Sequence, residues 1–155
     1  MTTQQTNISG WREWLALPDI GIPSVEAKID TGTTDSTLHT TFIEYFRREG
    51  KLWVRFGITP LPQREEIKLV CQAAVKEQRT LLDVREDQEA LPVIEAVVQI
   101  GQHQLTTDLL LNHHGIEAFT LHLGRNALQE LDLLVDPNRT CLLVESKNVS
   151  YDWGP

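Results

Sequence analysis

The sequence has few cysteines, few basic residues and no long apolar stretch. Its 155 residues include only two cysteines, Cys71 and Cys141, which argues against a scaffold held by disulfides. Lys and Arg total 14 against 22 Asp and Glu, and the resulting net charge of −8 argues against binding to a nucleic-acid backbone. No apolar run approaches the roughly 18 residues of a membrane-spanning helix, and the first residues lack the basic and apolar segments of a secretory signal. We therefore expect a cytoplasmic protein that binds neither nucleic acid nor membrane.

Helical periodicity is also scarce, and most apolar residues alternate with polar ones. Val25, Ala27 and Ile29 are separated by polar residues, a pattern typical of a strand with one buried face. Turn residues between such runs predict three hairpins, which pair residues 11–17 with 22–29, 43–47 with 52–58, and 93–100 with 103–111. The clearest helical spacing covers residues 125–131. These patterns predict an all-β fold of roughly nine or ten strands with one short helix.

The length of the chain suits one domain with a single hydrophobic core. We expect this domain over residues 10–146, with flexible tails at residues 1–9 and 147–155. Six charged residues lie between Arg79 and Glu89. They predict an exposed loop or strand end, with a binding patch as the alternative.

The tripeptide Asp30-Thr31-Gly32 follows directly after the predicted strand at residues 25–29. Gly32 permits a tight turn, so the Asp30 carboxylate would project from the end of that strand. The tripeptide alone is equally compatible with an ordinary turn. A second segment adds weight to the functional interpretation, because residues 119–123 predict another strand that Gly124 connects to the predicted helix.

Together, Asp30-Thr31-Gly32 and Leu123-Gly124-Arg125-Asn126 resemble the paired motifs of retroviral-type aspartic peptidases. In that fold, the second strand passes beside the loop that carries the aspartate, and the glycine lets the two backbones approach. The acidic Asp35 downstream of Gly32 also resembles the retroviral pattern. The resemblance implies a retropepsin-like acid-protease β-barrel.

A bacterial retropepsin-like family resembles the chain more fully, over about residues 10–145. Its members are named ATP-dependent zinc proteases, and their genes often neighbour those of ATP-grasp ligases that glutamylate a ribosomal protein. The shared segments include Gly10-Trp11-Arg12-Glu13-Trp14, Ala27-Lys28-Ile29-Asp30-Thr31-Gly32, Ser36-x-Leu38-His39, Trp53-Val54-Arg55-Phe56 and Leu123-Gly124-Arg125-x-Ala127-Leu128.

The resemblance implies an aspartic-type peptidase that acts on a peptide or protein substrate. Aspartic peptidases use two carboxylates, and this chain has one Asp-Thr-Gly, so a homodimer would supply one Asp30 from each subunit. Thr31 would bond the partner loop across the two-fold axis. Structural support of the catalytic Asp30, Thr31 and Gly32 would come from Asp35, Leu123, Gly124 and Arg125, with Arg125 paired to Asp35.

Several residues depart from the family pattern, in which Ala-Arg-Thr follows Asp-Thr-Gly. Thr33, Thr34 and Asp35 stand at those positions here, and Asp35 would add negative charge beside the dyad. Retroviral-type sites close with a glycine-tipped flap, yet no glycine occurs from residue 58 to residue 100. These departures favour an alternative, a catalytically inactive retropepsin-fold module that binds or regulates an ATP-grasp ligase.

The residues give no support for the zinc or the ATP in the family name. The five histidines form no His-Glu-x-x-His motif, and the two cysteines form no Cys-x-x-Cys. A phosphate-binding Gly-x-x-x-x-Gly-Lys loop is also missing. We therefore expect no cofactor and no metal.

Overall fold

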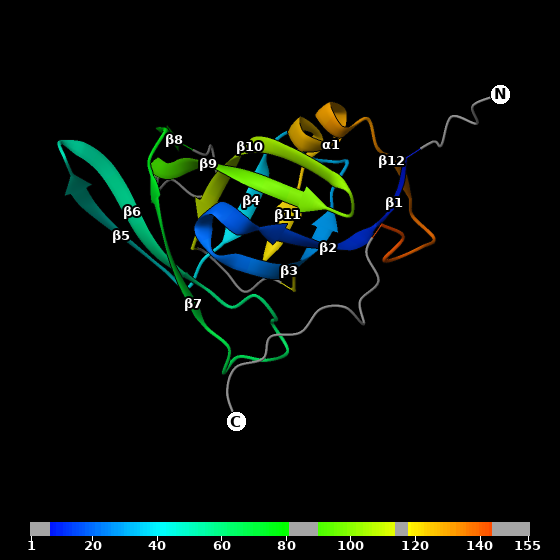
Figure 1. Ribbon diagram of the computed structural model, residues 1–155, viewed down its shortest axis with the longest axis horizontal. Coiled ribbons are helices and arrows are strands. Elements are labelled where there is room, and N and C mark those ends of the chain that lie inside the picture. Colours follow the sequence, from blue (N-terminus) through cyan, green and yellow to red (C-terminus); the bar gives the residue numbers. More distant parts are fainter. Residues whose placement is uncertain (1–6, 81–89, 114–117, 144–155) are drawn as a thin grey trace.

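Six strands close into a β-barrel (Figure 1). The computed structural model describes residues 7–80, 90–113 and 118–143. Around the barrel the strands follow the order β10-β4-β11-β3-β2-β9, and β9 pairs with β10 to close it. The strands are β2 (Arg12–Leu17), β3 (Ile22–Ile29), β4 (Ser36–His39), β9 (Ala90–Ile100), β10 (His103–Asn112) and β11 (Leu121–Leu123).

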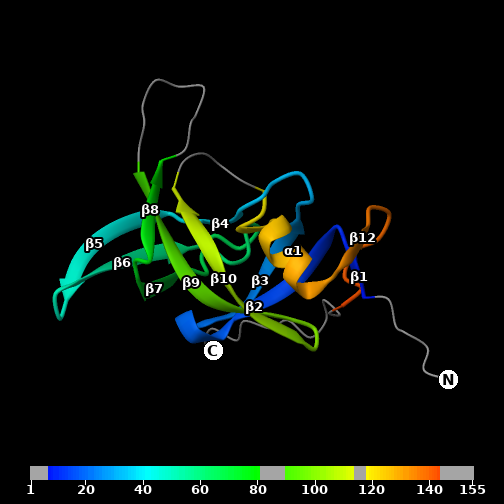
Figure 2. The same cartoon turned by 90° about the horizontal axis from the view of Figure 1, so that it is seen from above.

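All three predicted hairpins are confirmed. β2 pairs antiparallel with β3, and β9 pairs antiparallel with β10. The third hairpin joins β5 (Phe42–Arg48) to β6 (Lys51–Ile58), and β7 (Leu69–Ala74) adds a third strand to it. Figures 1 and 2 show that the β5–β6 hairpin extends away from the side of the barrel.

The remaining elements lie at the edges of the barrel. β8 (Glu77–Thr80) pairs with β9, and β1 (Ile8–Gly10) pairs in parallel with β12 (Leu134–Asp136). A 3-10 turn, η1 (Pro18–Ile20), connects β2 to β3, and helix α1 (Arg125–Leu131) has the predicted bounds. The all-β fold with one short helix is confirmed. The described residues hold twelve strands, more than predicted, because a period of two cannot be recognised in strands of three residues.

The core fills the barrel with the apolar side of each alternating strand. Val25, Ala27 and Ile29 are at most 5% exposed, as the alternation predicted. On β10, three consecutive residues, Leu109, Leu110 and Leu111, are buried, so buried and exposed residues do not alternate there. Leu110 belongs to a second, smaller cluster with Leu91 and Val93. Because neighbours in a strand face opposite sides, this second cluster lies on the other face of β9 and β10 from the main core.

The N-terminal boundary of the domain differs from the prediction. Ile8 and Ser9 were expected in a flexible tail, but both lie in β1, and Ser9 is fully buried. Of the charged stretch, Arg79 lies in β8, whereas residues 81–89 lie outside the described residues, as does the expected tail at 147–155. Within the described ranges, no helix is long and apolar enough to span a membrane.

A buried carboxylate ties both ends of the described chain to the barrel. Glu13, on β2, is fully buried. Its Oε2 accepts the backbone N–H groups of Gly10 (2.7 Å) and Leu142 (2.9 Å), and its Oε1 accepts the N–H of Leu143 (3.1 Å). Charge-assisted bonds of this kind are stronger than neutral ones, so Glu13 stabilises the segment that follows Thr140.

We expect Glu13→Gln to lower the free energy of unfolding by about 2 kcal/mol, because one amide nitrogen would face a backbone N–H and the charge would be lost. Urea denaturation measures this change. The matched substitution Glu130→Gln, at an exposed position of α1, should change stability by less than about 0.5 kcal/mol. Equal effects of the two substitutions would contradict the role of Glu13.

Candidate active site

Asp30 stands at the end of β3, where the strand leaves the barrel. Its backbone N–H donates to the carbonyl of Leu123 at 2.8 Å, which joins the end of β3 to the end of β11. Its Oδ1 accepts the N–H of Gly32 at 2.9 Å, so the tight turn orients the carboxylate. The side chain of Asp30 is 20% exposed, whereas Thr31 through Thr34 form an exposed loop.

Gly124 lies directly against this loop. A Cβ atom at Gly124 would lie 2.3 Å from the carbonyl oxygen of Asp35 and 3.1 Å from that of Thr33. The first residues of α1 continue the contact, because the N–H groups of Arg125 and Asn126 donate to the carbonyls of Thr33 and Thr34, each at 2.9 Å. These donors have no partner within a helix, so the loop supplies the acceptors that the start of α1 needs.

Two polar side chains that the sequence analysis did not single out fasten this junction. The hydroxyl of Ser36 is fully buried, accepts the N–H of Gly124 at 2.9 Å and donates to Oδ1 of Asn126 at 2.7 Å. Asn126 Nδ2 reaches back to the carbonyl of Asp108 at 3.3 Å. Both residues belong to segments shared with the family. The available signal was Asn126, a polar residue directly after the predicted first residue of the helix.

The predicted pairing of Arg125 with Asp35 is wrong. Arg125 donates instead to the carbonyl of Thr31 at 2.9 Å and to the hydroxyl of Thr34 at 3.0 Å, so it braces the loop through other partners. Asp35 pairs with Arg79 of β8 at 2.7 Å. The reason is geometric, because the Asp35 backbone packs on Gly124 while its side chain reaches β8.

Arg79 also changes the charge expected near the site. It pairs with Glu77 at 2.6 Å as well as with Asp35. Hydrogen bonds from Arg79 to Glu77 and Asp35 raise the pKa of Arg79, so the guanidinium stays cationic. Arg79 therefore offsets part of the negative charge that Asp35 was expected to add beside the dyad, because its single positive charge is shared with Glu77.

His122 of β11 lies beside the second carboxylate oxygen of Asp30. Its Nδ1 lies 3.8 Å from Oδ2 of Asp30, and its ring meets the ring of His39 edge-on with centroids 4.9 Å apart. His122 is one of the five histidines that were considered from the sequence only as metal ligands. Within the described residues, no three His, Cys, Asp or Glu side chains are arranged to hold a metal ion, so the residues there do not fit a zinc site.

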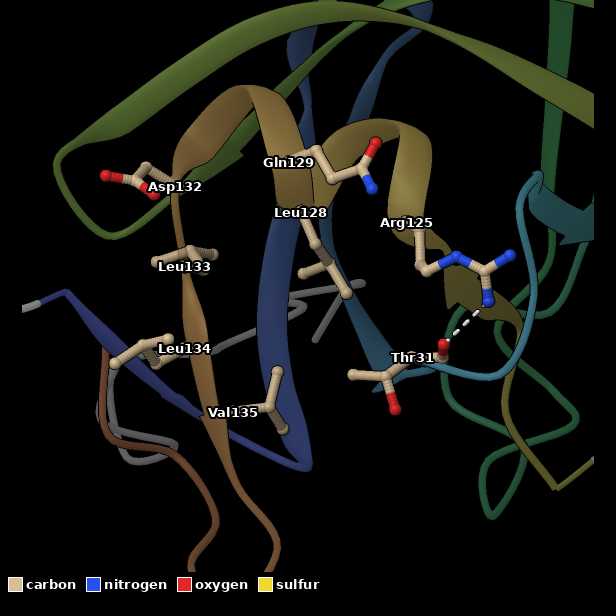
Figure 3. A pocket seen from close by; sticks show the side chains of 8 residues that line it. All are labelled: Thr31, Arg125, Leu128, Gln129, Asp132, Leu133, Leu134 and Val135. Carbon is tan, nitrogen blue, oxygen red and sulfur yellow. Dashed lines mark hydrogen bonds between the residues drawn. The ribbon is translucent and has the colours of Figure 1, made fainter.

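A cavity of about 430 Å³ opens beside the loop, between α1 and β12 (Figure 3). Thr31 and Arg125 line it at one end, where the figure marks their hydrogen bond. Leu128 and Leu133 supply apolar walls. The cavity is therefore continuous with the Asp30 loop but is walled mainly by apolar side chains.

The chain as a whole matches a known family. A family model described as the retropepsin-like aspartic endopeptidase RimB matches residues 8–146. The chain belongs to this RimB-like family. The match includes the Asp30 loop, β11 and the start of α1.

The chain is also similar to part of several longer curated proteins. A probable alpha-L-glutamate ligase of Shewanella halifaxensis is 32% identical over 145 residues, which are 94% of this chain and 31% of that protein. One from Desulfotalea psychrophila is 30% identical over 138 residues, 89% of this chain and 30% of that protein. The chain thus spans about a third of the length of these curated relatives.

The crystal structure of a Legionella pneumophila protein of unknown function has a similar fold. The superposition has a TM-score of 0.74 and covers 90% of this chain and 99% of that one, with 22% sequence identity. At this identity the likeness shows the fold alone. The superposition thus takes in almost the whole of that crystallised chain.

Proposed function

We propose that the protein is an aspartic-type peptidase whose active form is a homodimer with one Asp30 from each subunit. The observation that carries the proposal is the position of Asp30 at the end of β3, with Oδ1 held by the Gly32 N–H and the loop fixed on the start of α1. Membership of the retropepsin-like family supports it. Two such carboxylates placed close together can hydrolyse a peptide bond, as described next.

Two adjacent carboxylates cannot both stay ionised, so they share one proton. The ionised Asp30 would remove a proton from a water molecule as the water oxygen bonds to the carbonyl carbon of the scissile peptide. The protonated Asp30 of the other subunit would donate its proton to the carbonyl oxygen. Transfer of a proton to the amide nitrogen then breaks the C–N bond, which leaves a carboxyl group and an amine.

The surface beside Asp30 supports a second copy as the partner. Thr31 is exposed at the mouth of the cavity in Figure 3, whose lining continues to Leu134 and Val135 of β12. Leu134 is 59% exposed, and its partner on β1, Ile8, is 42% exposed. Burial of these apolar side chains against a second copy would stabilise a dimer and bring the two Asp30 loops toward one axis.

A cleavage assay at varied protein concentration tests this proposal. The substrate mixture should include glutamate-rich peptides, because the chain matches part of proteins named as glutamate ligases. We expect the rate per subunit to fall when the protein is diluted into the monomeric range, as measured in parallel by sedimentation. A rate per subunit that stays constant while the dimer dissociates would contradict the paired Asp30.

The surface itself can be tested with a matched pair of substitutions. Leu134→Asp should produce monomers and lower the rate per subunit. Val70→Asp, on β7, places the same charge at a position of similar exposure, 55%. It should change neither the oligomeric state nor the cleavage rate per subunit.

A second candidate is a catalytically inactive module that binds a glutamate ligase. The departure at Thr33, Thr34 and Asp35 favours it, as does the length of the relatives, of which this domain makes up about a third. Cleavage of no peptide at any concentration, together with binding of a glutamate ligase in calorimetry, would support this candidate over the peptidase.

A further inference from the structure

His122 and Asp30 face the same side of the sheet because of the parallel register of β11 with β3. Leu123 is paired with Ile29 and His122 with Lys28. Since alternate residues of a strand share a face, His122, Lys28 and Asp30 lie on one side, and Leu121 and Leu123 lie on the core side. The register therefore places the imidazole of His122, on β11, next to the carboxylate of Asp30, at the end of the neighbouring strand β3.

The two oxygens of Asp30 have different neighbours. Oδ1 accepts the N–H of Gly32, and Oδ2 faces Nδ1 of His122 at 3.8 Å. This separation is too long for a direct hydrogen bond but is within ion-pair range. The side chains are only 18% and 20% exposed, so water screens the pair less than it would screen a surface pair.

The surroundings of His122 hold its ring in place. On β4, the ring of His39 packs edge-on against it at 4.9 Å. On β3, the residue paired with it is Lys28, whose side chain is exposed. Among the described residues, the ionisable side chains that alternation places on this face of β2, β3 and β4 include Arg12, Glu26, Lys28, Asp30 and His39. The two acids have different partners, because Glu26 pairs with Arg12 at 3.8 Å whereas Oδ2 of Asp30 lies 3.8 Å from Nδ1 of His122.

We propose that His122 is a positioning residue for Asp30, which stabilises the ionised carboxylate when the imidazole is protonated. The idea extends the proposed function, since it matters for catalysis only if Asp30 activates water, although the contact itself does not depend on catalysis. Imidazole changes charge within the range of pH 5 to 8 that ordinary conditions span. A cation beside the dyad favours the ionised carboxylate that accepts the proton of water.

Nuclear magnetic resonance of the histidine ring nitrogens tests the contact without any activity. At about pH 6.5, where free imidazole is half protonated, we expect Asp30→Asn to lower the protonated share of His122 by about 1.2- to 1.7-fold, as for an ion pair of modest strength. His103, at the start of β10, serves as the internal control and should not change. An unchanged protonated share of His122 would overturn the inference.

The pH profile of kcat/KM tests the role in catalysis. In His122→Gln, we expect the acid limb to move to higher pH, because the cation that favours the ionised carboxylate is gone. His103→Gln should keep the wild-type profile. If Asp30→Asn retains full cleavage, the proposed function fails. The magnetic resonance measurement then still tests the contact between His122 and Asp30. If the resonance of His122 does not respond, this inference fails even though catalysis by Asp30 stands.

Discussion

Replacement of Asp30 by Asn is expected to reduce kcat/KM for peptide cleavage by at least about a thousandfold. The amide has nearly the shape of the carboxylate and keeps an oxygen that can accept the N–H of Gly32, so the loop should stay folded. An amide cannot accept the proton of water or share a proton with its counterpart. Cleavage of the same peptide by both proteins, with matched circular-dichroism spectra, measures the effect.

The matched control for this substitution is Asp108→Asn. Asp108 is on β10, and its carboxylate pairs with Lys76 at 2.9 Å rather than with the Asp30 loop. We expect its cleavage rate to stay within about twofold of wild type, as for surface changes away from a site. Cleavage by Asp30→Asn at the rate of Asp108→Asn would rule out Asp30 as the general base.

Gly124→Ala is expected to lower the free energy of unfolding by about 3 kcal/mol and to abolish cleavage. The added Cβ would lie 2.3 Å from the carbonyl oxygen of Asp35 and 2.7 Å from its carbonyl carbon. These are backbone atoms, so relief requires the loop to move away from α1. That movement would break the bonds from Arg125 and Asn126 to Thr33 and Thr34. Urea denaturation and peptide cleavage report the two effects separately.

Gly50→Ala provides the comparison for Gly124→Ala. Gly50 has a φ of +78° in the turn between β5 and β6, and an added Cβ would meet no atom within 4 Å. The substitution therefore costs only the strain of a positive φ, about 1 kcal/mol, and leaves the cleavage rate unchanged. A Gly124→Ala protein as stable as Gly50→Ala would show that the loop and α1 do not need close contact.

The strands and hairpins could be predicted from the sequence because their evidence is local, whereas the barrel was expected only from the family resemblance. Alternation at Val25, Ala27 and Ile29 defines one buried face, and short turns define the hairpins. Gly124 could be predicted to lie beside the Asp30 loop only through the family resemblance. The observed contact then gives its physical reason, because no side chain fits between Gly124 and Asp35.

The side-chain partners within the site could not be predicted in the same way. Arg79 and Asp35 are 44 residues apart, and their contact depends on where β8 joins the barrel, which no local pattern reports. The approach of His122 to Asp30 depends on the parallel register of β11 with β3. A shift of one residue in that register would turn His122 into the core, so the contact appears only once the pairing is known.

The contact between α1 and the Asp30 loop also determines when the site can form during synthesis. Arg125 lies 94 residues after Thr31, whose carbonyl it holds, and the Ser36 hydroxyl meets a backbone N–H 88 residues further on. Closure over such separations is slow compared with hairpin formation, because the chain loses much freedom before any contact compensates. A growing chain therefore carries Asp30 long before it can orient that residue. The loop acquires its shape only after the last barrel strand and α1 have been made, so the proposed peptidase would be inactive toward its own unfinished copies.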